Sequence, residues 1–374
     1  MSIYLILLFC TSLGLCACPE VSGSFFIEQQ DLYPESADWD PVTCRLYLSS
    51  QFNCTLVIYN PYNKTSKVVE IPGISHPGNP NYTEYHVNGI DYDAKSGNVF
   101  ISVSSAAAFT SVIAEGADGT IVPNYAAANY TGPNRVVVFD PKTECVVTDV
   151  GLLSAQNEFH NATGDYTSAF QDIAEIESTG DAYAPATFGN TIVRIPSGSS
   201  EPELWYATIS SSIFYGFGGI FSIGNKLVLS DSISGGLVTF DTTEQKDPKA
   251  TYVPLQSLPS DYKPLNADGL FAPSKYGGKV ALWSDDYNGT SVYGSSDNWE
   301  TAHFLGLILN DDPGVILGAM TTASFEIGQR VFTLTQIFQY SPPVQSKKNF
   351  LFYDVTTQLD AIVKASFVGN LTQN

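Results

Sequence analysis

The sequence predicts an all-β protein folded as a single six-bladed β-propeller. Two motifs that repeat in the same order along the chain predict it, together with the absence of a convincing long amphipathic helix. The chain has 374 residues, of which 44% are hydrophobic and 13% aromatic, enough to bury a large core. Propellers and barrels of this length often form one domain.

The first motif is a turn followed by a very apolar strand that ends in small polar residues. It occurs at residues 45–49, 98–102, 226–230, 279–283 and 330–334, and in a weaker form at 190–194. The second motif is an apolar strand that ends in an aromatic residue followed by Asn or Asp and a turn. It occurs at residues 57–61, 137–141, 238–242 and 350–354. Two motifs in a fixed order indicate one supersecondary unit used about six times.

Apolar runs such as residues 136–139 predict strands covered on both faces, as in the stacked blades of a propeller. A β-sandwich with irregular insertions is the alternative, and the ordered double repeat favours the propeller. The expected blade starts are Glu35, Asn88, Gln171, Tyr215, Asn266 and Thr321. A strand around residues 25–30 is expected to complete the last blade beside residues 361–367, which would close the ring and remove exposed sheet edges.

Two segments look like additions to this repeat. Residues 106–133 resemble an insertion into the second blade, and residues 152–167 precede the third blade. Long loops in a compact domain are often lids or binding loops. Surface decoration that bears glycans is an equal alternative.

The N-terminus indicates export. Residues 3–15 are an uncharged apolar run, too short to span a bilayer, and small residues follow it. We expect a signal peptide over residues 1–18, with an uncertain cleavage site, and the propeller over residues 19–374. No later stretch predicts a membrane span. The expected location is the secretory pathway: the lumen of the endoplasmic reticulum, a vacuole or vesicle, or the medium.

Acceptor sequences for N-linked glycans support export. They occur at Asn53, Asn63, Asn81, Asn129, Asn161, Asn288 and Asn370. Cys10 and Cys16 lie in the leader, so one or two disulfides are possible and their pairing stays open. Cys44 and Cys54 are expected at opposite ends of a hairpin, too far apart to bond.

The acidic net charge argues against nucleic acids and anionic membranes as binding partners. The formal net charge is -21, so the surface should repel nucleic acid and anionic membranes. We expect a monomer that binds a small molecule.

The polar residues at the blade starts are the candidate site. The innermost strand of every blade begins at the central channel, so residues at these starts converge. Converging carboxylates and carboxamides would suit Ca²⁺, or would raise the pKa of one carboxyl and make it a general acid. The alternative is that these residues cap turns. His86 precedes the second blade start and is a candidate for the funnel wall.

Residues 35–40, 88–91 and 268–270 resemble the blade starts of the six-bladed superfamily of gluconolactonases, regucalcin-type proteins and paraoxonases. In that superfamily Glu, Asn and Asp side chains bind a catalytic divalent cation. The resemblance implies Glu35, Asn88 and Asp268 as ligands, possible Ca²⁺ binding, and a Ca²⁺-dependent lactonase or esterase. The fourth blade start has glycines where that superfamily has an Asn ligand.

Residues 26–40, the leader and the repeat layout resemble the propeller proteins of fungal trichothecene gene clusters. That resemblance implies a role in sesquiterpenoid mycotoxin biosynthesis. We expect a cyclase that binds a terpenoid in the funnel and closes its oxygen ring with loss of water. A non-catalytic carrier or interaction protein of the pathway is the alternative. The candidate acids are Asp38, Asp91, Asp172, Glu175 and Asp268. The candidate substrate-binding residues are Trp39, His86, Asn88, Tyr92, Gln171, Tyr215, Phe217 and Asn266.

Overall fold

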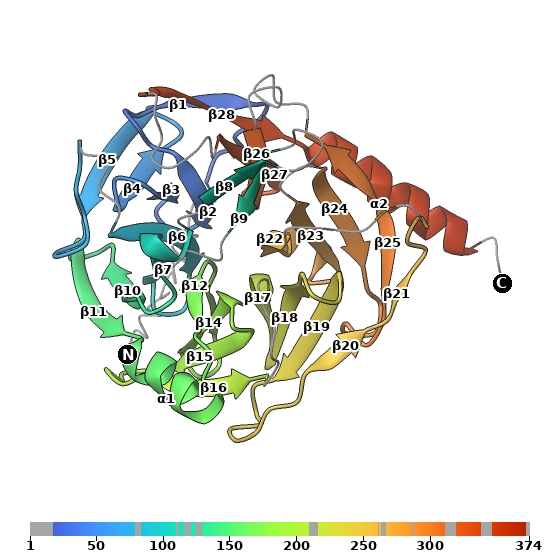
Figure 1. The fold of residues 1–374 in the computed structure, drawn as a ribbon. Helices are drawn as coiled ribbons and strands as arrows, with labels where there is room; N and C mark the ends of the chain where they lie inside the picture. Colours follow the sequence, from blue (N-terminus) through green and yellow to red (C-terminus); the bar gives the residue numbers. More distant parts are fainter. Residues whose placement is uncertain are drawn as a thin grey trace, which may run out of the picture.

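The computed structural model is a ring of six antiparallel sheets around a central channel (Figure 1). This confirms the predicted six-bladed propeller. The structure describes residues 18–78, 84–109, 112–115, 121–124, 129–208, 216–260, 262, 267–285, 288–310, 319–337 and 346–371. Tyr215 and Asn266, two of the predicted blade starts, lie outside the described residues, directly before the first strands of blades 4 and 5.

The first three blades follow the chain from the centre outward. Blade 1 consists of β2 (Pro34–Asp40), β3 (Arg45–Ser50), β4 (Thr55–Asn60) and β5 (Thr65–Glu70). Blade 2 consists of β6 (Tyr85–Tyr92), β7 (Val99–Ser105), β10 (Arg135–Asp140) and β11 (Cys145–Gly151). Blade 3 consists of β12 (Ser168–Phe170) and β13 (Ala174–Ile176), both paired with β14 (Asp181–Phe188), then β15 (Thr191–Ile195) and β16 (Glu203–Ala207).

The other three blades repeat this order. Blade 4 consists of β17 (Phe217–Ile223), β18 (Lys226–Asp231), β19 (Gly236–Asp241) and β20 (Thr251–Val253). Blade 5 consists of β22 (Ala267–Phe271), β23 (Val280–Asp285), β24 (Gly289–Gly294), β25 (Ala302–Leu309) and the parallel edge strand β21 (Leu255–Gln256). Blade 6 consists of β26 (Ala319–Ile327), β27 (Arg330–Ile337), β28 (Asn349–Asp354) and β1 (Phe25–Glu28).

The N-terminal strand closes the ring, as predicted, but its partner is not the predicted one. β1 pairs antiparallel with β28, with Phe25 opposite Phe352 and Ile27 opposite Phe350. Residues 361–367, predicted as the partner strand, belong instead to helix α2 (Thr356–Leu371). Leu359, Ile362 and Val363 follow helical spacing and pack beside the outer strands of blade 5, so burial favours a helix here.

Short helices and a hairpin form the two segments that were predicted as additions to the repeat. The segment before blade 3 contains helix α1 (Leu153–Thr163), which buries Ala155 and Phe159 and ends at Gly164 in the left-handed conformation. The insertion in blade 2 contains a short 3₁₀ helix (Ala106–Phe109) and a hairpin of β8 (Val112–Glu115) and β9 (Ile121–Asn124).

The hydrophobic core lies between neighbouring blades. One cluster joins Tyr47 and Leu56 of blade 1 to Ile90 and Val137 of blade 2, and all of them are buried. Residues 136–139 are buried throughout, which confirms that this strand is covered on both faces. Each blade therefore depends on its neighbours for its core.

A disulfide holds the start of the described chain on blade 1. Cys18 bonds to Cys44, while Cys54 and Cys145 are free. This agrees with the prediction that Cys44 and Cys54 are too far apart to bond to each other. The sequence alone does not predict that Cys18 is the partner of Cys44.

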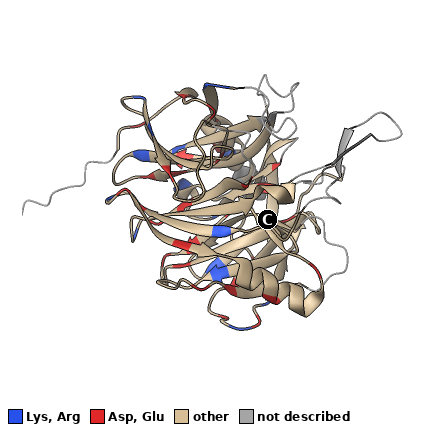
Figure 2. Cartoon of the chain, turned by 60° about the vertical axis from the view of Figure 1, so that its left-hand side comes forward, with Lys and Arg blue, Asp and Glu red and all other residues tan. Residues whose placement is uncertain are grey.

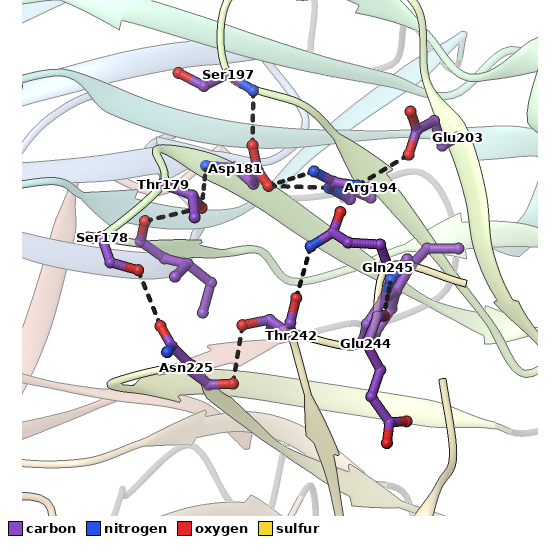
Figure 3. A network of polar contacts seen from close by, with 12 residues as sticks. Ser178, Thr179, Asp181, Arg194, Ser197, Glu203, Asn225, Thr242, Glu244 and Gln245 are labelled. Atoms are coloured by element: carbon purple, nitrogen blue, oxygen red, sulfur yellow. Dashed lines mark hydrogen bonds and ion pairs between the residues drawn. The ribbon is translucent and has the colours of Figure 1, made fainter. Parts of the chain in front are cut away.

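Charged groups are spread over the structure, with acidic residues on loops and strand ends of several blades (Figure 2). A polar network joins blades 3 and 4 away from the centre of the ring (Figure 3). Arg194 binds Asp181 at 2.7 Å, and Ser178 donates to the Asn225 side chain at 2.9 Å. In the part of the chain that the structure describes, no helix is long and apolar enough to cross a membrane.

Candidate functional site

A narrow throat closes the central channel. The first strand of most blades has a bulge at equivalent positions, between Pro34 and Ala37, Val87 and Ile90, Phe217 and Ile220, Ala267 and Leu270, and Thr321 and Ala323. Bulge residues of blades 1, 4, 5 and 6 line a shared pocket with two residues of blade 3. This pocket is lined by Glu35, Ser36, Gln171, Asp172, Gly218, Gly219, Asp268, Gly269, Thr322 and Ala323, which we call the throat. Its free space has room for about one water molecule.

Serines from the second strands of blades 1, 2 and 4 hold the bulges of those blades in place. The Ser49 hydroxyl accepts the Ser36 N–H at 2.8 Å, and Ser102 and Ser230 accept the N–H groups of Gly89 and Gly219 at 2.9 Å. These serines are the small polar residues that end the first repeated motif. A bulge exposes backbone donors that the sheet does not satisfy, so a buried hydroxyl at this position stabilises it.

Glycines allow the first strands to approach one another at the throat. A Cβ on Gly219 would lie 1.9 Å from the Leu270 nitrogen, and one on Gly89 would lie 2.5 Å from the Asp172 Cα. The glycines at the fourth blade start are therefore required for close backbone approach. Because a side chain does not fit at this position, the fourth blade start carries no Asn that could bind a metal ion.

Asp172 is the throat acid whose charge state is most strongly set by its surroundings. Its two carboxyl oxygens accept the N–H groups of Ile173 and Ile220, each at 2.9 Å. Burial raises the pKa of Asp172 to about 7, although these two hydrogen bonds lower it in part. The side chain keeps partial exposure, so it can exchange a proton near neutral pH.

Three further acids follow the throat on the first strands of blades 1 to 3. Burial raises the pKa of Asp38 well above its usual range, and the Asp91 carboxylate raises it further. Burial likewise raises the pKa of Asp91 to about 6 and that of Glu175 to about 8. Glu175 is 4% exposed, and its Oε1 has no hydrogen-bond partner among the described residues. The structure thus brings Asp38, Asp91, Asp172 and Glu175 into one interacting set, which we call the channel acids.

On the side where the first strands begin, aromatic rings gather beside the throat. His86 stacks on Phe109 with ring centres 5.5 Å apart, and its edge meets Phe52 at 5.3 Å. Phe188 continues the group, 6.1 Å from Phe109 and 4.9 Å from Tyr130. Burial lowers the pKa of His86 to about 4, so its imidazole is neutral at pH 7. We call these five residues the mouth cluster.

Sequence reasoning identified only His86 of this cluster. Phe109 and Tyr130 belong to the predicted insertion, which could have been a signal, whereas nothing in the local sequence around Phe52 or Phe188 pointed to the mouth. Ala169, three residues before Asp172, packs with Phe188 in the same cluster. The cluster therefore contacts β12, the strand of blade 3 that leads to Asp172.

The other candidate binding residues have different surroundings. Trp39 and Phe217 are buried in the hydrophobic clusters between blades. Tyr92 stacks on Tyr47 with ring centres 5.9 Å apart. Gln171 lines the throat, and its side-chain amide oxygen Oε1 accepts the Thr187 hydroxyl. Tyr215 and Asn266 lie outside the described residues.

The proposed metal ligands form an incomplete donor set. Glu35 and Asp268 both line the throat. Asn88 is fully buried, its amide donates to Ser104 at 2.8 Å, and its Oδ1 has no partner among the described residues. No group of three or more His, Cys, Asp or Glu side chains in the described ranges could hold a metal ion. Gly218 offers no side-chain donor, so Glu35, Asn88 and Asp268 supply only part of the oxygen donors that a divalent cation needs, and the chemistry proposed below uses no metal.

Comparison with known proteins finds two relatives that match nearly the whole chain. No protein-family model matches the sequence. Trichothecene biosynthesis protein 14 of Trichoderma arundinaceum is 26% identical over 370 residues, which cover 94% of this chain and 93% of that protein. Core trichothecene cluster protein 14 of Fusarium sporotrichioides is 25% identical over 368 residues, which cover 94% of this chain and 89% of that protein.

Among solved structures, the major allergen Mala s 1 of Malassezia sympodialis has a TM-score of 0.74 at 18% identity. The match covers 90% of this chain and 96% of the allergen. At this identity the likeness shows the fold alone. The two sequence relatives span nearly the whole propeller, and the chain is a distant homologue of trichothecene biosynthesis protein 14.

Proposed function

We propose that this protein binds a hydroxylated sesquiterpenoid intermediate of trichothecene biosynthesis and promotes closure of its oxygen ring with loss of water. The observation that carries the proposal is Asp172, a throat acid with a pKa of about 7 beside an aromatic cluster. The homology to trichothecene biosynthesis proteins supplies the class of substrate.

The size of the throat decides where such a substrate would bind. A sesquiterpenoid is far larger than the space for about one water molecule between the bulges. It would therefore lie on the mouth side, with its hydrocarbon rings against the partly exposed Phe109 and Tyr130, which pack over the buried Phe188. Apolar burial and aromatic contact suit a terpenoid skeleton, and one polar group could reach Asp172.

The reaction balances with one carboxyl group. Asp172 donates its proton to an allylic hydroxyl, whose C–O bond breaks and releases water. A second hydroxyl of the same substrate attacks the carbon, forms the ring C–O bond and returns its proton to the Asp172 carboxylate. The aromatic faces would stabilise positive charge as it develops on the allylic carbons. A general acid of this kind contributes about 10²–10⁴-fold to a rate.

A non-catalytic carrier of the pathway is the second candidate, and a specific observation favours it. Both oxygens of Asp172 already accept backbone N–H groups, as do oxygens of Asp38 and Asp91. Carboxyls used in this way could serve only to join blades. Binding of the terpenoid without turnover would then be the function of the mouth cluster.

A timed chromatographic assay separates the two. Purified protein is mixed with a hydroxylated trichodiene-derived triol at near-neutral pH, beside heat-denatured and EDTA-treated samples. We expect regioselective ring closure with native protein, a rate lower by about 10²–10⁴-fold in Asp172→Asn, and no change in the exposed control Glu201→Gln. Equal rates in native and denatured samples, with retained binding of the triol, would favour the carrier.

We also propose that the protein enters the secretory pathway. The apolar leader and the glycan acceptor sequences support this proposal. The Cys18–Cys44 disulfide supports it as well, because such bonds persist in oxidising compartments, and it requires that the leader is cleaved before Cys18. Microscopy of the tagged full-length chain in a fungal cell tests it, with a leaderless chain as the control.

A further inference from the structure

We infer that Asn53 stays unmodified in the folded protein and acts as a structural hydrogen-bond donor, whereas Asn63 and Asn129 are the main carriers of N-linked glycans among the acceptors whose side chains the structure describes. The inference rests on the proposed secretory export, because the oligosaccharide is added there. All of these acceptor sequences have the form Asn-x-Thr, so the inference depends only on how their surroundings in the fold differ.

Asn53 is buried together with its whole acceptor sequence. The residue is 7% exposed, and Cys54 and Thr55 are at most 1% exposed. The Asn53 amide nitrogen, the atom that would carry a glycan, donates to the Asp31 carbonyl at 2.9 Å. The backbone carbonyl oxygen of Asn53 accepts the His76 N–H at 3.0 Å. A glycan on this nitrogen would have to replace the bond to Asp31 and displace the buried residues around it.

Asn63 and Asn129 have the opposite arrangement. Both are exposed, and in each acceptor sequence the threonine bonds to the asparagine carbonyl oxygen. Thr65 donates its hydroxyl to the Asn63 oxygen at 2.6 Å, and Thr131 does the same to Asn129 at 2.6 Å. These contacts engage the oxygen, which leaves the nitrogen as the atom for attachment. A turn with this geometry holds the acceptor away from the sheet.

The two other exposed acceptors are less favourable. Asn161 lies within helix α1, where the Thr163 hydroxyl bonds to the Phe159 carbonyl at 2.8 Å. The Asn288 amide donates to Asp285 at 3.1 Å, and Thr290 is 1% exposed. We expect lower occupancy at both than at Asn63 and Asn129. Asn81 lies outside the described residues, and the side chain of Asn370 is not described.

Site-resolved mass spectrometry tests the inference. The full-length chain is produced in a secreting fungal host, and the folded monodisperse fraction is treated with a glycosidase in ¹⁸O water. Each glycosylated asparagine then becomes a labelled aspartate. We expect no label at position 53 and high labelling at positions 63 and 129. Label at position 53 in folded protein would overturn the inference. Absence of label at every position would overturn both it and the export proposal, while leaving the ring-closure assay unaffected.

Two matched variants give an independent readout. Asn63→Gln should lose one glycan, seen as faster migration on a denaturing gel, and keep its Tm. Asn53→Gln should keep the wild-type migration and lower the Tm by several degrees, because the longer side chain misplaces the donor to Asp31. A faster-migrating Asn53→Gln band would contradict the structural role.

Discussion

Asp91 on the first strand of blade 2 accepts the backbone N–H of Glu175 in blade 3 at 2.6 Å. The same kind of bond joins Asp38 to the Tyr92 N–H at 2.6 Å and Asp172 to the Ile220 N–H at 2.9 Å. Carboxyl groups thus connect blades 1 to 4 in succession beside the axis. In blades 4 and 5, Phe221 and Phe271 occupy the positions equivalent to Asp38 and Asp91, so apolar packing replaces the carboxyl there.

The bond between Asp91 and Glu175 predicts different effects for two substitutions. Asp91→Asn keeps an oxygen that accepts the N–H, so its stability at pH 7 should match or exceed that of the wild type. Asp91→Ala leaves the Glu175 N–H buried without its acceptor and should cost about 1–3 kcal/mol. Urea unfolding followed by tryptophan fluorescence measures both. Equal losses in the two variants would show that the bond contributes nothing.

Stability should fall as the pH rises. The folded-state pKa of Glu175 is raised to about 8 from an ordinary value of 4.5, because burial and the nearby Asp93 and Asp91 disfavour its charge. The folded chain holds this proton where the unfolded chain releases it, so stability present at low pH is lost between about pH 4.5 and pH 8. Burial raises the pKa values of Asp91 and Asp172 to about 6 and about 7, so each also contributes stability that is lost as the pH rises to about its folded-state pKa.

Glu175→Gln removes one titration from this profile. Its stability should equal that of the wild type near pH 5 and exceed it at pH 8 by on the order of 1–3 kcal/mol. Thermal unfolding across this pH range measures the difference, and Glu201→Gln on an exposed turn is the control. A Glu175→Gln profile parallel to that of the wild type would show that Glu175 ionises normally.

The repeated motifs predicted the fold because each carries a physical requirement. The apolar second strand must pack between two blades, and the serine at its end must hold the bulge of the first strand. Ser49, Ser102 and Ser230 satisfy that second requirement. The serine recurs in the sequence motif because it bonds to the bulged backbone at the throat. Similar reasoning placed the channel acids near one another, since their blade starts converge.

The remainder depends on contacts that a local pattern does not contain. Phe52 and Phe188 are 136 positions apart and join the mouth cluster only through the ring of blades. Residues 361–367 have apolar content suited to either a strand or a helix, and the edge that β1 occupies on β28 decided the outcome. Trp39 and Phe217 adjoin the blade starts in sequence but turn into the core, because successive residues of a strand face opposite sides.

Close backbone approach at the throat predicts that Gly219 tolerates no side chain. A Cβ there would meet the Leu270 nitrogen at 1.9 Å, and backbone cannot move aside as a flexible side chain can. Gly219→Ala should therefore destabilise the protein by about 1–3 kcal/mol or more. Gly151→Ala is the matched control, because a Cβ at Gly151 has nothing within 4 Å. Chemical unfolding of both variants measures the contrast, and a wild-type midpoint for Gly219→Ala would mean that the blades can separate at the throat without cost.

The Cys18–Cys44 disulfide predicts a redox-dependent stability. It joins residues 26 positions apart and holds the segment before β1, whose Gly23 N–H also donates to Asp354 of blade 6 at 2.8 Å. Loss of the crosslink frees the unfolded chain and loosens the strand that closes the ring, so the Cys18→Ser and Cys44→Ser double variant should lose about 2–4 kcal/mol. Reduction should lower the wild-type Tm to the value of the double variant and leave the variant itself unchanged. Cys145→Ser, at a free exposed thiol, should behave as the wild type in both conditions. A double variant as stable as the oxidised wild type would instead mean that β1 pairing with β28 closes the ring without help from the crosslink.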